Sequence, residues 1–522
     1  MTAVESFIDY KANTGMQCGS YYIDLPELKP GQQYRFHFDA TKCIGCHCCE
    51  VACNEQNNNP AEIKWRRVGE VEGGEFPNVL QMFLSMSCNH CVEPACLIGC
   101  PTNAYIKLEN GIVIHDDPAC IGCQYCTWNC PYDVPVFHEE RHIVTKCHMC
   151  YERIEEGQSP ACVQACPEGA IEIEVVDVDE WVNEKMQKEG SAPFLIDPKY
   201  TKSTTRFTLP KDMPKELHPA DEALIKPAHN EWPLVVMTVL TQVSFISFVA
   251  LFLGDLAAKF TELPEPSPAM AIVTFLLSAI GLPLSALHLG RPIKAMSAMK
   301  NLKTSWLSRE AAALGAFTGL MTIVALLYIL NIDGLLRLFL EAITAAIGAY
   351  GIYAQSMIYR VPAKPTWNRV TTTYRFFSTG YIGTLILAFI AIIQGESNVA
   401  NILLAISILL GSLQLYLFFE SQRFYDKPNE EFGYVIKKAK KLLENEFKKL
   451  YDFRKISLPL GAILFPLLAI IALNAGSLGF AFGFALLGVI LASASEFVGR
   501  LLFYSTALKT GMPGNFFAGS MR

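Results

Sequence analysis

Sixteen of the 18 cysteines fall into four runs that repeat one spacing. Each run opens with two cysteines separated by two residues, and it closes with two cysteines separated by three. The runs are Cys43, Cys46, Cys49 and Cys53; Cys88, Cys91, Cys96 and Cys100; Cys120, Cys123, Cys126 and Cys130; and Cys147, Cys150, Cys162 and Cys166. So regular a pattern indicates thiolates that bind metal. A disulfide framework is typical of small secreted chains, and this chain is not small.

The spacing also indicates which metal centre is held. It is that of bacterial ferredoxins and its variants, in which three thiolates bind one iron–sulfur cluster and the fourth binds the neighbouring cluster. A proline follows the fourth cysteine in three of the four runs, as Pro101, Pro131 and Pro167. Structural zinc, the alternative, usually takes CxxC pairs. We therefore predict four 4Fe-4S clusters, and we expect no three-iron cluster because every ligand position holds cysteine.

Two cysteines lie outside this pattern. Cys48 falls inside the stretch "CIGCHCCEVACNE", and Cys18 stands alone. A first run that used Cys48 in place of Cys49 would have a spacing that no other run shows. We interpret both cysteines as residues that bind no metal.

Composition divides the chain into two parts. Apolar residues make up 51% of the 522 residues and the mean hydropathy is +0.25. We expect an α+β ferredoxin-like domain over residues 1–185, an extended linker over 186–231, an all-α bundle of eight transmembrane helices over 232–508 and a tail over 509–522. β-prone pieces lie at 111–116 and 169–178. The net charge of −7 gives no reason to expect a nucleic-acid partner.

Eight apolar segments in the second part are each close to the ~20 residues that cross a bilayer. The expected spans are 232–256, 268–288, 310–331, 335–358, 374–394, 398–420, 456–475 and 478–504. Lys and Arg gather in the loops 289–309, 359–373 and 421–455, whereas the opposite loops and helix ends hold only Lys259 and Arg337. The positive-inside rule then predicts an inner-membrane protein whose cysteine domain faces the cytoplasm. The first residues carry no basic or apolar stretch, so we expect no signal peptide.

Histidine content bears on the electron carrier in the membrane. Of the ten histidines, only His288 lies in an expected span, and His229 lies just before the first span. One histidine cannot supply both axial ligands of a bis-histidine haem, so we expect no haem, although a His–Met haem remains formally open. A quinone then becomes the expected carrier. His288 ends the second span and Glu310 begins the third, where they could exchange protons with a quinone.

Longer motifs resemble a known family. Residues 36–175, with "KCIGCHCCEVACNEQN" and "MSCNHCVEPACLIGCPTNA", resemble the electron-transfer subunit of the dimethyl sulfoxide reductase family of molybdenum enzymes. Residues 229–508, with "SALHLGRPIKAMSAMKNLKTSWLSREA" and "SEFVGRLLFYS", resemble the membrane anchor of that family. The two are usually separate chains and are fused here. The resemblance implies a partner catalytic subunit that carries molybdopterin, and it also points to His288 and Glu310 as the quinol-binding region.

The resemblance also implies how the runs pair, which spacing alone leaves open. Runs one and four would share two clusters, and runs two and three the other two. The implied ligand sets are Cys43, Cys46, Cys49 with Cys166; Cys147, Cys150, Cys162 with Cys53; Cys88, Cys91, Cys96 with Cys130; and Cys120, Cys123, Cys126 with Cys100. Electrons would pass between the partner subunit and the quinone pool, and the direction stays open because sulfite-oxidising relatives would run the reaction in reverse.

Two other functions compete with this prediction. A redox-linked ion-translocating subunit would need several charged residues in the spans, and the sequence offers Glu341, Glu496 and Arg500. Glu496 and Arg500 are four residues apart, so they could instead pair with each other. A hydrogenase or formate dehydrogenase partner is the second alternative.

Overall fold

The computed structural model describes residues 27–229, 231–427 and 432–513. The chain forms two compact units, one made of residues 1–226 and 509–522 and the other of residues 227–508. The predictions about Cys18, the signal peptide and the last residues of the tail fall outside the described residues.

The first unit contains small sheets and short helices. Strand β1 pairs with β8 in antiparallel register, with Phe36 opposite Ile173, and with β9 in parallel register. A second sheet has the order β10-β2-β3, and two short hairpins complete the set. The strands are β1 (Gln32–Asp39), β2 (Arg67–Glu75), β3 (Asn78–Met86), β4 (Tyr105–Lys107), β5 (Val113–His115), β6 (Val136–His138), β7 (Ile143–Thr145), β8 (Ile171–Asp177), β9 (Arg206–Thr208) and β10 (Leu217–Pro219). The two β-prone segments predicted from the sequence are β5 and β8.

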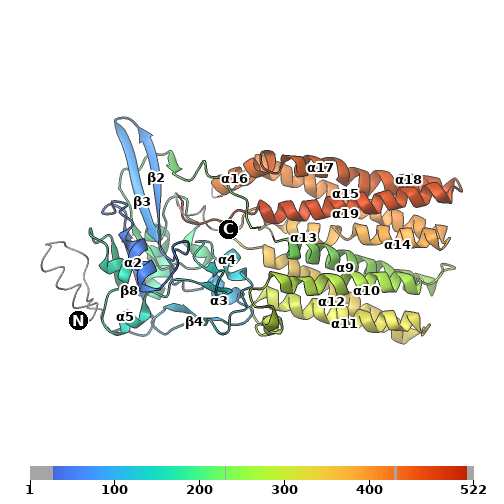
Figure 1. Ribbon diagram of the computed structural model, residues 1–522, viewed down its shortest axis with the longest axis horizontal. Coiled ribbons are helices and arrows are strands. Elements are labelled where there is room, and N and C mark those ends of the chain that lie inside the picture. Colours follow the sequence, from blue (N-terminus) through green and yellow to red (C-terminus); the bar gives the residue numbers. More distant parts are fainter. Residues whose placement is uncertain (1–26, 230, 428–431, 514–522) are drawn as a thin grey trace. The chain divides into compact units, whose positions relative to one another are not determined.

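The helices of this unit are short (Figure 1). They are α2 (Cys48–Gln56), α3 (Ala95–Gly99), α4 (Tyr125–Asn129), α5 (Tyr151–Glu155), α6 (Ala161–Gln164), α7 (Val178–Glu180), η1 (Trp181–Lys185), α8 (Met186–Glu189) and η2 (Pro198–Tyr200). Small sheets joined by short helices confirm the predicted α+β ferredoxin-like fold of the amino-terminal part.

The segment expected to be an extended surface linker differs from that expectation in part. Its residues 201–205 include buried side chains, and β9 completes the β1 sheet. The indole of buried Trp181 donates a 2.8 Å hydrogen bond to the Ser203 carbonyl, and the Thr204 hydroxyl donates to the Asn89 carbonyl at 2.8 Å. These polar threonines and serines are buried because the backbone beside the second cysteine run supplies their hydrogen-bond partners.

The second unit is helical. Its elements are α9 (Trp232–Ala258), α10 (Pro268–Leu284), η3 (Ser285–His288), η4 (Pro292–Met299), α11 (Trp306–Ile329), α12 (Leu335–Tyr359), α13 (Val370–Ser378), α14 (Tyr381–Ile393), α15 (Ser397–Asp426), α16 (Gly433–Glu444), α17 (Lys448–Pro459), η5 (Leu460–Leu464), α18 (Phe465–Asn474) and α19 (Leu478–Ser505). In the described part of the chain, eight helical segments are long and apolar enough to cross a membrane. This confirms the predicted eight-helix bundle.

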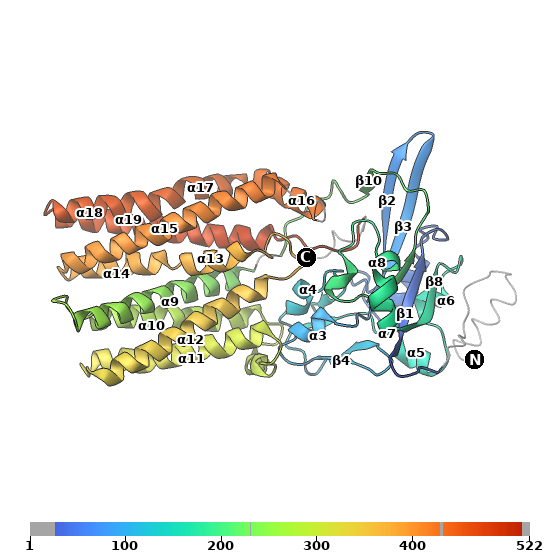
Figure 2. The same ribbon diagram turned by 180° about the vertical axis from the view of Figure 1, so that it is seen from behind.

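The observed spans run close to the predicted ones. The sixth and seventh are longer, at 397–426 and 448–474, because their polar ends continue the helix beyond the apolar stretch. Helices α9 and α14 lie in the middle of the bundle, with α10–α12 on one side and α15–α19 on the other (Figures 1 and 2). Gly383 permits the close approach of α14 to α9, since a Cβ there would lie 2.4 Å from the Ser247 hydroxyl oxygen.

Candidate metal centres and membrane site

All four cysteine runs share one local structure. The third cysteine of each run is the second residue of a short helix: Cys49 in α2, Cys96 in α3, Cys126 in α4 and Cys162 in α6. The fourth cysteine follows the helix directly in α3 and α4, where Cys100 and Cys130 are extended. Proline explains this, because it disfavours helical backbone at the residue before it. No proline follows Cys53, which stays inside the longer helix α2.

The first two cysteines of each run also share a turn. The residue before the second cysteine has a left-handed φ of 43° to 69° in every run, as Gly45, His90, Gly122 and Met149. The backbone N–H of that residue donates to the sulfur of the first cysteine, at 3.4 Å for Gly122 and for Met149. A hydrogen bond that points at sulfur favours the thiolate, the form that binds metal.

The fold brings cysteines of different runs together. Burial raises the pKa of the Cys53 thiol, and the neighbouring charges of Cys147, Cys162 and Cys150 raise it further. The pKa of the Cys43 thiol is likewise raised by burial and by its neighbours Cys166 and Cys46. The other two neighbourhoods are Cys88, Cys91, Cys96 with Cys130, and Cys120, Cys123, Cys126 with Cys100. Run one therefore meets run four, and run two meets run three.

These neighbourhoods fit a cluster better than a single ion. Among the described residues, the groups of three or more ligand atoms within 4.8 Å of one another contain no cysteine. Tetrahedral zinc would hold its sulfurs about 3.8 Å apart, given a Zn–S bond of about 2.3 Å. Burial raises the pKa of the Cys49, Cys123 and Cys150 thiols to about 12. Such thiols keep their proton at neutral pH unless a metal replaces it, which is the behaviour of cluster ligands.

Cys48 and Cys49 differ in position although they are adjacent. Cys48 is exposed and is the first residue of α2. In α4 the corresponding first position is occupied by Tyr125. Cys49 is buried, its sulfur lies 3.4 Å from the Ser85 hydroxyl oxygen, and it takes the place of Cys126. Cys48 still lies close to Cys46 and Cys166. The repeated helix geometry favours Cys49 as the ligand.

A buried arginine accompanies two of the cysteine groups. Arg66 is 1% exposed, and it donates to the hydroxyls of Ser85 at 3.1 Å and Ser87 at 2.9 Å. No carboxylate of the described residues lies within ion-pair distance of it. Burial opposes its charge, yet nearby cysteine thiolates hold its pKa above the usual value. These are Cys162, Cys49, Cys147 and Cys53. Such a cation needs a buried anion, and a thiolate-bound cluster is one.

Replacing Arg66 by Gln should lower the reduction potential of a nearby cluster, because the reduced form carries the extra negative charge. A unit charge about 10 Å away contributes about 1.7 kcal/mol at an effective dielectric of about 20. For one electron this corresponds to roughly 70 mV. Potentiometric titration followed by electron paramagnetic resonance measures the shift. Arg66→Lys, which keeps the charge, is the control. Equal potentials in Arg66→Gln and the wild type would contradict the prediction.

In the membrane unit, His288 lies against a residue that the sequence analysis did not name. Glu231, directly before α9, accepts from the His288 Nδ1 at 2.7 Å, and both side chains are largely buried. His229 Nδ1 lies 3.5 Å from the other Glu231 oxygen. Burial opposes the charge of Glu231, but hydrogen bonds from His229 and His288 lower its pKa to about 2. The carboxylate therefore orients the His288 ring.

Glu310 belongs to a different hydrogen-bond network. It is 8% exposed and hydrogen-bonded to Gln355 of α12. The side-chain amide of Gln242 in α9 donates to the Gln355 Oε1 at 2.7 Å, and Arg500 of α19 donates to the Gln242 Oε1 at 2.7 Å. The structure thus gives His288 and Glu310 different immediate partners, although both lie at the same end of the bundle.

The suggested pairing of Glu496 with Arg500 is wrong. Glu496 is bonded instead to Gln414 at 2.9 Å and to Arg454 at 3.3 Å. Although the two residues are one helical turn apart on α19, neighbouring helices offer each of them a partner. Glu341 lies at the opposite end of the bundle, 3.9 Å from the Arg337 Nε.

Comparison with known proteins bears on both units. Residues 79–176 match the family described as 4Fe-4S dicluster domain, and residues 226–506 match the family described as DMSO reductase anchor subunit (DmsC). The second match covers more than half of the sequence. This chain is a member of the DMSO reductase anchor subunit family. In this member an iron–sulfur domain precedes the anchor, so the predicted fusion of the two is confirmed.

Relatives of the iron–sulfur half carry related names. One chain of the anaerobic dimethyl sulfoxide reductase of Haemophilus influenzae is 41% identical over 155 residues, which are 28% of this chain and 76% of the relative. Its namesake from Escherichia coli is 41% identical over 153 residues, 28% of this chain and 75% of the relative. A sulfite dehydrogenase subunit of Allochromatium vinosum is 32% identical over 217 residues, 37% of this chain and 89% of the relative. With the eight apolar helices, the anchor family makes this a multi-pass membrane protein.

Sequence reasoning missed Glu231 and Arg66. Glu231 had a visible signal, since an acidic residue stands directly before the first span, at the end of the bundle where the second span finishes at His288. Arg66 had none, because it lies between the first and second cysteine runs without a motif. Its role depends on burial, which only the fold reveals.

Proposed function

We propose that this protein is the electron-transfer and membrane-anchor subunit of a molybdopterin oxidoreductase. It passes electrons through four 4Fe-4S clusters between a partner catalytic subunit and the membrane quinone pool. One observation carries the proposal. A single chain combines four cysteine loops of the same local structure with an anchor of the DMSO reductase type. Nothing in the sequence resembles a pterin-binding domain, so molybdopterin and the substrate chemistry belong to the partner.

The four ligand sets follow the neighbourhoods of the thiols. Cys43, Cys46 and Cys49 with Cys166 hold one cluster, and Cys53 with Cys147, Cys150 and Cys162 holds the next. Arg66, buried beside both sets, offsets their negative charge. Cys88, Cys91 and Cys96 with Cys130, and Cys120, Cys123 and Cys126 with Cys100, hold the other two. Bound clusters supply one-electron transfer, and these residues fix where each cluster lies.

On the membrane side, His288 is the group that exchanges a proton with the quinone, and Glu231 is a positioning residue that holds the ring. The Nδ1 hydrogen bond to Glu231 fixes the orientation of the His288 imidazole, a ring whose nitrogens can give or accept a proton. Glu310, at the same end of the bundle, is the second candidate proton carrier, connected through Gln355 to Gln242. Menaquinone is the proposed quinone, no haem takes part, and the iron–sulfur domain faces the cytoplasm from the inner membrane.

A second direction of electron flow has one observation in its favour. The match to the sulfite dehydrogenase relative covers 89% of that protein, more than the matches to the two dimethyl sulfoxide reductase relatives cover of theirs. In that direction a partner would oxidise a sulfur compound and this protein would reduce quinone.

Anaerobically purified full-length protein in detergent tests the proposal. We expect about 16 irons per chain, visible absorbance that bleaches on chemical reduction, and bleaching by a reduced menaquinone analogue. An iron content of one or two ions, or zinc in its place, would overturn the cluster assignment. Clusters that bleach chemically but never with the quinol would overturn the quinone assignment alone. Purification with the partner subunit then shows whether its substrate oxidises or reduces the clusters.

A further inference from the structure

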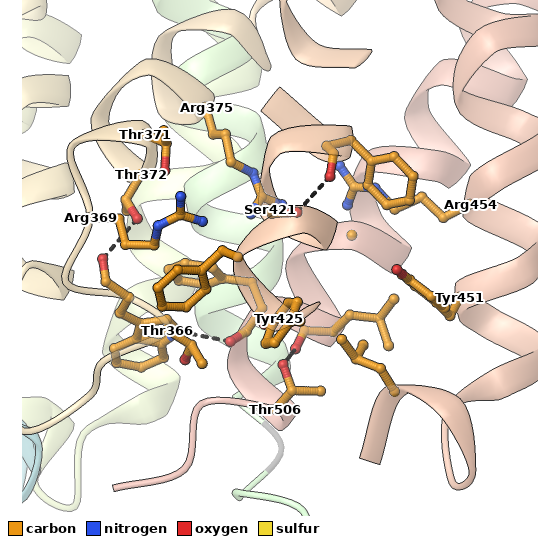
Figure 3. A pocket seen from close by; sticks show the side chains of 17 residues that line it. Thr366, Arg369, Thr371, Thr372, Arg375, Ser421, Tyr425, Tyr451, Arg454 and Thr506 are labelled. Atoms are coloured by element: carbon orange, nitrogen blue, oxygen red, sulfur yellow. Dashed lines mark hydrogen bonds between the residues drawn. The ribbon is translucent and has the colours of Figure 1, made fainter. Parts of the chain in front are cut away.

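One end of the membrane unit contains a hollow lined by arginines (Figure 3). It lies among the start of α13, the end of α15, the start of α17 and the end of α19. Arg369, Arg375 and Arg454 line it, and none of its 17 lining residues is acidic. Because successive spans alternate in direction, this is the end of the bundle at which His288 also lies.

The carboxylates nearby do not balance these cations. Arg369 forms an ion pair with Glu420, and Arg454 lies 3.3 Å from Glu496. Arg375 has no carboxylate within 4.0 Å among the described residues, and Figure 3 shows its guanidinium between those of the other two. Within the described part of the chain, the buried Nε of Arg454 also has no hydrogen-bond partner. The hollow therefore has unused donors and an excess positive charge.

The glycine at position 499 leaves the space that the Arg454 guanidinium occupies. A Cβ at Gly499 of α19 would lie 0.7 Å from the Arg454 Nη1, so any larger residue would displace the guanidinium. A guanidinium without a counter-ion is costly in a low-dielectric bundle. Two neighbouring cations increase that cost. A bound anion would remove it, whereas a neutral quinone ring would not.

We propose that this hollow binds the phosphate head group of an anionic phospholipid. Guanidinium groups match phosphate oxygens in geometry and charge, and basic pockets between membrane helices are suited to anionic lipid heads. Thr371 also lines the hollow and adds a hydroxyl for the same head group, whereas the Ser421 hydroxyl already donates to the Phe418 carbonyl at 2.7 Å. The site is distinct from the residues assigned to the quinone.

Two neighbouring surfaces favour a lipid over a free anion. Apolar side chains on α15 and α17 are exposed close to the hollow in sequence, at Phe419, Phe453 and Ile456, where acyl chains could lie. An adjoining hollow shares Tyr425, Leu443 and Tyr451 with the first, and it is bordered by Lys440, Lys448 and Lys455. Lys440 and Lys455 are paired there with Asp426 and Asp452, so the net positive charge comes from the wider segment 432–455. These lysines belong to the basic segment 432–455, a pattern that suits a membrane surface rich in anionic lipid.

The test uses full-length protein, delipidated in detergent, and measures its thermal unfolding midpoint. Phosphatidylglycerol, phosphatidylcholine and inorganic phosphate are added at equal phosphate concentration. We expect phosphatidylglycerol alone to raise the midpoint, and Arg375→Gln to need at least about tenfold more of it. Arg423→Gln is the matched control, because Arg423 is an exposed arginine of α15 that does not line the hollow. It should behave as the wild type does.

Each other outcome overturns the proposal. Equal effects of the two lipids would remove the role of charge, and a full effect of inorganic phosphate would make the ligand a free anion. Unchanged lipid affinity in Arg375→Gln would place the lipid elsewhere. Native mass spectrometry of the wild type is independent of any variant, and it should show phosphatidylglycerol retained in preference to phosphatidylcholine.

Discussion

Cys49→Ser should lose one intact four-iron cluster, whereas Cys48→Ser should keep all of them. Cys49 is the buried second residue of α2, the position that the third cysteine takes in the other runs. Cys48 takes the place of Tyr125 and is exposed. We expect a three-iron signal in the oxidised Cys49 variant, and quinone-linked turnover reduced by roughly tenfold or more because the chain of centres is interrupted.

Electron paramagnetic resonance of the oxidised protein and iron analysis measure this difference. The two variants are adjacent in sequence and chemically identical, so each controls for the other. Because Cys48 also lies close to Cys46 and Cys166, proximity to other ligands does not by itself separate the two cysteines, and the comparison of variants is needed. A three-iron signal in Cys48→Ser with a normal spectrum in Cys49→Ser would exchange the two assignments and refute the interpretation of the repeated helix geometry.

His288→Leu should reduce quinone-linked turnover by about 100-fold or more, the scale of a lost proton-transfer group. The ring lies 2.7 Å from Glu231 at the end of the second span, so leucine removes both the proton-exchanging nitrogen and the orienting bond. The clusters should still bleach on chemical reduction, since the cysteine runs belong to the other unit. Stopped-flow absorbance after mixing with a menaquinol analogue measures the step directly.

His229→Leu is the control for this prediction. His229 also bonds Glu231, at 3.5 Å, but its side chain is largely exposed. We expect near-normal turnover in that variant. Normal turnover in His288→Leu would exclude His288 as the proton-exchanging group, and a loss confined to Glu310→Gln would move the quinone chemistry to the network of Gln355 and Gln242.

Much of the fold was predictable because it depends on local patterns. The eight spans follow from runs of apolar residues, since backbone in a bilayer must satisfy its own hydrogen bonds as helix. Strands β5 and β8 followed from short β-prone segments, one between the second and third cysteine runs and one after the fourth. The segment 201–208 was harder to predict, because its threonines are polar and only the fold supplies the partners that bury them.

The sequence by itself determined the chemistry of this protein: four cysteine runs for iron–sulfur clusters, eight apolar spans for a membrane, and one histidine within those spans. Only the tertiary structure decided which groups meet. It joined His288 to Glu231, separated Glu496 from Arg500, and gathered Arg369, Arg375 and Arg454 around one hollow. The physical reason is that ligand spacing and hydrophobicity are local properties of the chain. The balance of buried charge depends on residues that are distant in sequence and become neighbours only on folding.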